Sequence, residues 1–383
     1  MRVWFPSLAL AAAAAVCLAA SAAEPGQEFA IGVGDTDQRV PLVSYDSTRD
    51  DYLVVWLDVF GETLKSRAVS AKRSGEISLG KIRSLDSNAF PEALAYSPRR
   101  REHLLLSSDR PFERYKPLRA TRLRPNGRTR GESLQIDITP GCGSIEDADL
   151  EYLPLPRRWL LVWGEENCGL KARRLKGRTL EFDGPEVILE RSRFLSFPEP
   201  SLAYGSTAGE VLLTYRDTDM RVLAVRLDGD GRALSAGTVV PYGSAPVATY
   251  QPTRNRWLVT WESEARVMGR FVSSDGTLGE VFKLASRFSF SPAAAYNSFA
   301  NRILVNWSIG NFGIKGRWYH PSAVPTSRRF RIGELGTRQS FWSTGNLIAC
   351  SERANHCLAV WEKQVQRPGV ISDHIYGEIV TAK

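Results

Sequence analysis

The chain has 383 residues, of which 43% are hydrophobic and 24% charged, and its formal net charge is +8 at neutral pH. This excess of positive charge is mild for such a length, so composition alone does not indicate a nucleic-acid-binding protein. After the N-terminal segment, no stretch is apolar enough to span a membrane as a helix.

The N-terminus has the features of an export signal. Arg2 gives a positively charged start, residues 8–20 form an apolar run too short to cross a membrane, and small residues around Ala22 offer a cleavage site. We therefore expect a signal peptide over residues 1–23 and a single mature domain over residues 24–383. The mature protein is expected to be secreted or periplasmic.

The rest of the chain repeats one pattern seven times. In most units a tyrosine ends a short apolar run, and a second aromatic residue follows eleven positions later. The first position holds Tyr45, Tyr96, Tyr152, Tyr204, Tyr250, Tyr296 and Cys350, and the second holds Trp56, Ser107, Trp163, Tyr215, Trp261, Trp307 and Trp361. The distance between successive units varies from 46 to 56 residues. A fixed spacing inside units of variable length is typical of a repeat architecture.

The fifth unit gives the clearest prediction of strands. Segments rich in β-branched and aromatic residues lie at 246–250, 257–261, 267–272 and 281–284. Each unit is therefore predicted to be a four-stranded antiparallel meander, and helices should be scarce. The inner strands are apolar on both faces and need cover on both sides. Seven such sheets around an axis provide it, so the predicted fold is all-β, a seven-bladed β-propeller.

The seventh unit lacks a fourth strand of its own. Its predicted strands lie at 347–350, 357–361 and 375–380. Residues 28–31 resemble the fourth strands of other units. We therefore expect the start of the mature chain to pair with 375–380 and complete blade seven, which leaves no unpaired edge in the ring.

Four cysteines follow the signal, and an even number in an exported chain favours two disulfides. Cys350 and Cys357 occupy positions that hold facing aromatic residues in other units, so a disulfide is expected to replace an aromatic pair. Cys142 and Cys168 fall in two loops that share one face of a propeller. They are expected to form the second disulfide.

The units resemble a repeat of exported bacterial proteins, of the form Pro-x-x-Ala-Tyr followed by Tyr-Leu-Val-Val-Trp. Residues 52–56 and 159–163 match the middle motif, and residues 267–270 and 375–378 match the motif of the third strand. The resemblance covers nearly the whole mature chain and implies a propeller. It implies no catalytic residue and no defined activity.

Several acidic residues are predicted near the central axis, where the innermost strands line a channel. They are Glu92, Glu146, Asp147 and Glu199. Converging carboxyl groups have raised pKa values and serve as acid–base groups or cation ligands. The alternative is that they accept hydrogen bonds from neighbouring backbone amides and line a wet pore.

A second series of acids follows the second strand in six units. Its members are Asp58, Asp109, Glu165, Asp217, Glu262 and Glu362. They would form a carboxylate rim for a cation, an amine or a basic peptide. The alternative is that they are solvated residues that end a strand and begin a turn.

Arginines gather in the predicted hairpins between first and second strands, on the opposite face. The ligand-binding candidates among them are Arg99, Arg100, Arg101, Arg254 and Arg256. A cationic face of this kind would bind an acidic protein, an acidic polysaccharide or lipid head groups. The alternative is that the arginines only keep the turns soluble.

Motifs of catalysis are scarce. The four histidines have no metal-ligand spacing, and the chain has neither a Gly-x-Ser-x-Gly elbow nor a phosphate-binding glycine loop. We therefore predict an exported non-catalytic propeller, a monomer without cofactor or metal. It would act as a binding or scaffolding module in the bacterial cell envelope, with a protein or an anionic envelope component as partner. The alternative is a hydrolase or lyase that acts on an acidic or glycan substrate through carboxylates in the central funnel.

Overall fold

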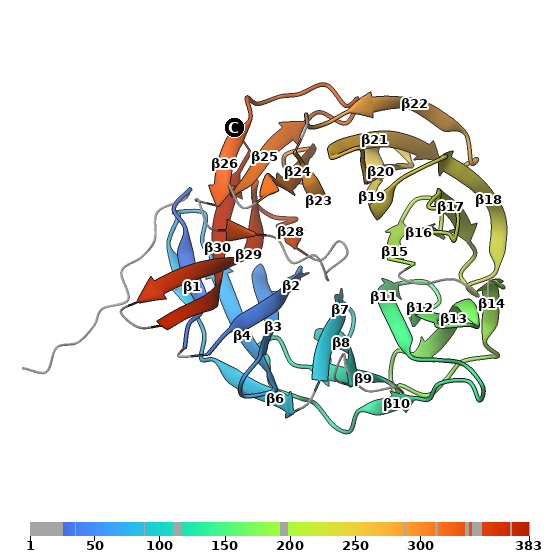
Figure 1. The fold of residues 1–383 in the computed structure, drawn as a ribbon, viewed down its shortest axis with the longest axis horizontal. Helices are drawn as coiled ribbons and strands as arrows, with labels where there is room; N and C mark the ends of the chain where they lie inside the picture. Colours follow the sequence, from blue (N-terminus) through green and yellow to red (C-terminus); the bar gives the residue numbers. More distant parts are fainter. Residues whose placement is uncertain are drawn as a thin grey trace, which may run out of the picture.

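A computed structural model of the chain describes residues 26–382, except 35, 88, 110–116, 192–197, 287, 311–312, 334–336, 339–346 and 368–369. Seven β-sheets stand around a common axis and follow one another in chain order around the ring (Figure 1). This is the seven-bladed β-propeller that the repeat predicts. The predicted signal peptide lies outside the described residues.

In the first four blades the chain runs from the axis outward, strand by strand. Blade one has β2 (Gln38–Asp46), β3 (Asp51–Asp58), β4 (Thr63–Ala71) and β5 (Ile77–Leu79), and β6 (Arg83–Ser87) also pairs with β4. Blade two has β7 (Ala89–Ser97), β8 (Glu102–Asp109), β9 (Leu118–Leu123) and β10 (Leu134–Ile136). Blade three has β11 (Ile145–Leu153), β12 (Arg158–Glu165), β13 (Gly169–Lys176) and β14 (Val187–Glu190). Blade four has β15 (Ser201–Gly205), β16 (Glu210–Arg216), β17 (Val222–Leu227) and β18 (Ala233–Val240).

Blades five and six have the same order. Blade five has β19 (Ser244–Gln251), β20 (Arg256–Ser263), β21 (Arg266–Ser273) and β22 (Leu278–Lys283). Blade six has β23 (Phe290–Asn297), β24 (Arg302–Ser308), β25 (Ile314–Tyr319) and β26 (Phe330–Gly333). A short 3-10 helix, η1 (Pro252–Arg254), joins β19 to β20. Across the described ranges, no helix has the length and apolar character that a membrane crossing requires.

Blade seven combines both ends of the described chain. It has β28 (Ile348–Cys350), β29 (His356–Arg367), β30 (Val370–Thr381) and β1 (Phe29–Gly32), and β27 (Thr337–Arg338) also pairs with β29. Phe29 lies opposite Gly377 and Ala30 lies opposite Tyr376, so the predicted closure is confirmed. A Cβ atom on Gly377 would lie 2.7 Å from Cδ1 of Ile31, so the glycine permits this close packing of β1 on β30.

The hydrophobic core lies between neighbouring blades. Leu104 of blade two and Trp163 of blade three belong to one buried cluster, and Leu212 of blade four and Trp261 of blade five belong to another. The five tryptophans at the second repeat position are at most 1% exposed. Large aromatic side chains dominate core packing, which explains why this position is aromatic in six of the seven units.

The two predicted disulfides are present. Cys350 and Cys357 face each other across β28 and β29, with their Cα atoms 3.9 Å apart. In blade three the same two positions hold Tyr152 and Trp159, whose ring centroids are 4.9 Å apart, so a disulfide does replace an aromatic pair. The second disulfide joins the loop before β11 to the loop after β12, as expected for two loops on one face.

Candidate functional site

The innermost strands of all seven blades border one cavity on the axis. These strands are β2, β7, β11, β15, β19, β23 and β28, and the cavity has a volume of about 420 Å³. Its wall is made by the last residues of each strand, such as Val43 to Tyr45 in blade one. The cavity therefore lies at the end of the strands where the first hairpins begin. Cavities of this size are usual for small-molecule sites.

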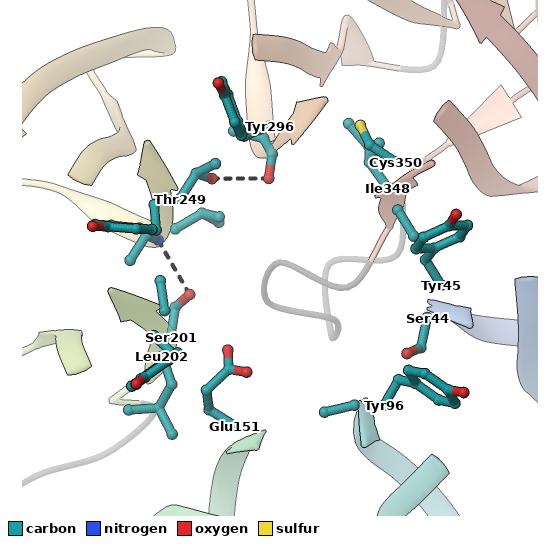
Figure 2. A pocket seen from close by; sticks show the side chains of 18 of the residues that line it. Ser44, Tyr45, Tyr96, Glu151, Ser201, Leu202, Thr249, Tyr296, Ile348 and Cys350 are labelled. Atoms are coloured by element: carbon teal, nitrogen blue, oxygen red, sulfur yellow. Dashed lines mark hydrogen bonds between the residues drawn. The ribbon is translucent and has the colours of Figure 1, made fainter. Parts of the chain in front are cut away.

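The repeated tyrosines surround the cavity and extend away from its centre, as Tyr45, Tyr96 and Tyr296 show in Figure 2. Their hydroxyl groups donate to hairpin side chains: Tyr45 to Asp50 at 2.7 Å, Tyr96 to Thr48 at 2.7 Å, Tyr250 to Asn255 at 2.7 Å and Tyr296 to Asn301 at 2.8 Å. Burial raises the pKa of Tyr45 and Tyr96, so both phenols stay neutral at physiological pH. The tyrosines thus anchor the hairpins and offer ring carbons to the cavity.

Polar side chains on the cavity wall connect neighbouring blades. Asp149 accepts the amide of Leu150 with Oδ1 at 2.8 Å and the amide of Leu202, in the next blade, with Oδ2 at 2.7 Å. Ser201 Oγ accepts the amide of Ala248 at 3.2 Å, and Thr249 Oγ1 donates to the carbonyl oxygen of Ala294 at 2.9 Å (Figure 2). These contacts join blades three to six in sequence. The groups that make them are therefore engaged in holding the ring together.

The carboxyl group of Glu151 points toward the centre of the cavity (Figure 2). Its Oε1 accepts the amide of Tyr152 at 3.1 Å. Burial raises the pKa of Glu151 to about 8, the nearby Asp149 acts in the same direction, and the amides of Tyr152 and Tyr204 oppose the shift. A buried carboxyl group that titrates near neutral pH and faces a cavity is typical of functional sites.

The sequence-based selection of site residues missed Glu151, although the repeat contains the signal. The position just before the repeated tyrosine is small in the other six units: Ser44, Ala95, Ala203, Thr249, Ala295 and Ala349. A long acidic side chain among small ones is an exception to the pattern. Because this position of the innermost strand borders the channel, the exception alone could have identified Glu151.

Three of the acids predicted near the axis, Glu92, Asp147 and Glu199, do not line the cavity. Glu92 accepts a hydrogen bond from Ser108 at 2.5 Å, and Asp147 and Glu199 accept backbone amides of the next blade. Burial raises the pKa of Glu199, and Arg216, 3.8 Å away, partly offsets this shift. Glu146 belongs to β11, and its side chain lies outside the described part of the structure.

A recurrent contact between a carboxyl group and an amide joins successive blades. The acceptor and donor pairs are Asp147 with Glu199, Glu199 with Ala245, Glu262 with Ser291, and Glu362 with Val40, at distances from 2.6 to 3.3 Å. The donor amides all belong to residues with φ between 47° and 53°, five positions before the repeated tyrosine. Such φ values are uncommon outside glycine, so their recurrence marks one shared structural device. Glu262 and Glu362, from the predicted acidic rim, take part in it.

The predicted arginines divide into exposed and packed side chains. The exposed ones, which we call the hairpin rim, are Arg99, Arg101 and Arg254. Arg100 lies 3.3 Å from the fully buried Glu102. Arg256 packs on Phe271, with its Cζ atom 3.5 Å from the ring centroid, and burial lowers its pKa. The rim is on the first hairpins, at the same end of the molecule as the cavity.

Comparisons with known proteins agree with the fold. No family model and no curated protein matches the chain. Among solved structures, the BP39L lectin from Burkholderia pseudomallei is 14% identical with a TM-score of 0.59, over 91% of this chain and 100% of that chain. The periplasmic gluconolactonase PpgL from Pseudomonas aeruginosa is 13% identical with a TM-score of 0.51, over 77% and 85%. BBS1N, in complex with ARL6DN, is 10% identical with a TM-score of 0.55, over 94% and 96%. At these identities the likeness establishes a shared propeller fold alone.

Proposed function

We propose that this protein is an exported, non-catalytic binding module of the bacterial cell envelope that holds a small ligand in its central cavity. One observation carries the proposal: a cavity of about 420 Å³ whose wall includes residues of all seven innermost strands. Such a site exists only when the ring is complete. Ligand binding would therefore also stabilise the closed propeller, because a ligand that binds only the folded state adds to its stability.

Binding is favoured over hydrolysis because the cavity offers few groups for acid–base chemistry. Most enzymes that hydrolyse glycosides use a pair of carboxyl groups in complementary roles. Glu151 faces the centre, whereas both oxygens of the neighbouring Asp149 accept backbone amides. Turnover of chromogenic glycosides or lactones by the purified protein would instead support the enzyme alternative.

Three features support export. Two disulfides are typical of oxidising compartments. The first residues have the composition of a signal peptide. The repeat motif resembles that of exported bacterial propellers, and we include membership of that group in the proposal. Cell fractionation with N-terminal sequencing tests it: an uncleaved chain in the cytoplasm would contradict export.

The cavity assignment is tested by filling the cavity. Ala95 is on the cavity wall and half-buried, so Ala95→Phe should occupy space that the ligand needs. Ala233 is exposed on β18, away from the axis, so Ala233→Phe is the matched control. After incubation with envelope extract, native mass spectrometry should detect a bound small molecule on the wild type and on the control only. Equal retention by all three proteins, with equal thermal unfolding, would contradict a ligand in the cavity.

A further inference from the structure

In the described part of the chain, the acidic side chains on the cavity wall have no basic counterpart. They are Asp149, Glu151 and Glu352, and no lysine, arginine or histidine is among the described residues that line the cavity. The whole chain has the opposite balance, with a net charge of +8. A cavity with acidic groups and no basic ones repels anions and attracts cations, and the attraction is stronger where water is partly excluded.

The hydrogen-bonding groups around the cavity argue against a sugar as ligand. Sugars are recognised by several polar groups at once, but here most of the polar groups have protein partners. The hydroxyl groups of Ser201 and Thr249 join neighbouring blades, and those of Tyr45, Tyr96 and Tyr296 bond to hairpins. The likeness to a lectin structure concerns the fold alone and gives no reason to expect a glycan in this cavity.

A divalent metal ion also fits poorly. Calcium takes six to eight oxygen ligands, and magnesium takes six in a near-octahedral arrangement. One oxygen of Asp149 accepts a hydrogen bond from the amide of Leu150, and the other accepts one from the amide of Leu202. The carboxyl group therefore contributes negative charge, but its two oxygens are not placed to chelate a metal ion. The carboxyl group of Glu151 points toward the centre (Figure 2). Because an ionised carboxylate has about four acceptor sites, Glu151 can accept a hydrogen bond from a positively charged donor in addition to the one from the amide of Tyr152.

We propose that the cavity binds a small organic cation, a protonated amine, with the carboxylate of Glu151 as its counter-ion and the tyrosine rings around its organic part. This inference rests on the proposed function, because it names the ligand class of the same cavity. Hydrogen bonds between ionised partners are about twice as strong as neutral ones. The accessible wall of the cavity is mostly polar, and the tyrosine rings at its border add carbon atoms that can contact the rest of the ligand.

Proton release should accompany binding. Burial raises the pKa of Glu151 to about 8, so the group is mostly protonated at pH 7 before a cation binds. A bound cation favours the ionised carboxylate and lowers this pKa. The amine therefore displaces a proton from Glu151 to solvent as it binds. Between pH 7 and pH 6 the apparent affinity should fall close to tenfold, because the fraction of ionised Glu151 falls about tenfold.

The test uses three probes of the same shape and different charge: 2-phenylethylammonium, 2-phenylethanol and phenylacetate. Calorimetric titration in two buffers of different ionisation enthalpy measures the affinity and the number of protons released. The proteins are the wild type, Glu151→Gln, which keeps the shape of the side chain, and Glu280→Gln, which removes one exposed acid on β22, outside the cavity wall.

The wild type should bind the ammonium probe at least tenfold more tightly than the other two and release up to one proton at pH 7. Glu151→Gln should lose at least tenfold in affinity and all proton release, whereas Glu280→Gln should change the affinity less than threefold. If phenylacetate or 2-phenylethanol binds as tightly as the ammonium probe, or if none of the three binds, the cation proposal is overturned. The cavity-filling comparison with Ala95→Phe still decides whether a ligand of another class occupies the cavity.

Discussion

The cavity and the hairpin rim are neighbours in space and opposites in charge. The cavity wall has Glu151 and two further acids, and the rim has exposed arginines such as Arg99 and Arg254. Both are parts of the same strand–hairpin units, only a few residues apart along the chain. The net charge of +8 therefore reflects the basic residues of the solvated turns, whereas the ionisable groups of the cavity wall are acidic. In a propeller, the chemistry of the axis depends on a few inward positions of the innermost strands.

The largest effect should come from Asp149, which holds two blades together from the cavity wall. Asp149→Ala leaves the amides of Leu150 and Leu202 without their acceptor in a buried place. Unsatisfied buried groups cost about 1–3 kcal/mol each, so we expect a loss of about 3–5 kcal/mol in the free energy of unfolding. Urea denaturation measures it.

Glu352→Gln is the matched control, because it removes an acid from the edge of the same cavity where the side chain is exposed. Its effect on stability should stay within about 0.5 kcal/mol. If Asp149→Ala changed the free energy of unfolding as little as this control, Asp149 would not hold the two blades together. Its oxygens would then be available to a ligand, and the argument against a metal ion would fail.

The second effect concerns the pH dependence that Glu151 imposes on folding. The pKa of Glu151 is about 8 in the folded protein, above the value of 4.5 for an unperturbed glutamate. The folded state therefore holds the proton more tightly, and stability falls as pH rises from about 4.5 to 8. Glu151→Gln removes this dependence. The variant should gain on the order of 3 kcal/mol relative to wild type between pH 5 and pH 8.5.

This difference is read from urea denaturation of both proteins across the pH range. Glu378, whose pKa is also raised to about 8 by burial and by Glu28, contributes to both proteins and cancels in the comparison. Parallel stability curves for the two proteins would mean that Glu151 is solvated and ionised at neutral pH. Ligand binding would then release no proton.

The fold could be predicted from the sequence because each blade needs the same kinds of residue at the same positions, so the pattern recurs seven times. Trp163 and its equivalents are all needed to fill the space between blades, so their fixed spacing from the tyrosines indicates the sheet pairing. The closure by Phe29 and the disulfide of Cys350 were predictable for the same reason, because each fills a position that other units define.

The site was harder to predict because carboxyl groups near the axis have two uses. Glu92 and Glu199 were predicted as site residues from their positions in the sequence. In the structure, Glu92 accepts a hydrogen bond from a side-chain hydroxyl group, and Glu199 accepts one from a backbone amide of the next blade. The donor amides depend on unusual φ values, as at Ala245 and Val40. Alanine and valine rarely adopt a positive φ, so the sequence does not indicate this conformation at Ala245 or Val40. Glu151, in contrast, departs from a pattern that the sequence does contain.

The smallest effect is expected from the rim itself. Changing Arg99, Arg101 and Arg254 to serine removes three exposed charges from the hairpins that surround the cavity end. At low salt their loss should raise the affinity for 2-phenylethylammonium by less than threefold, because like charges no longer repel the probe. At about 0.15 M salt the Debye length is about 8 Å, so the gain should disappear.

Arg128 and Arg232, exposed on turns between third and fourth strands, provide the control. Their replacement by serine should leave the affinity unchanged at either salt concentration, since these turns lie toward the outside of the ring (Figure 1). A change of more than threefold in the rim variant that persists at high salt would mean direct contact between rim and ligand. The ligand would then extend out of the cavity. An acidic group on the ligand could pair with the arginines of the hairpin rim, because the described residues of the cavity wall include no basic one.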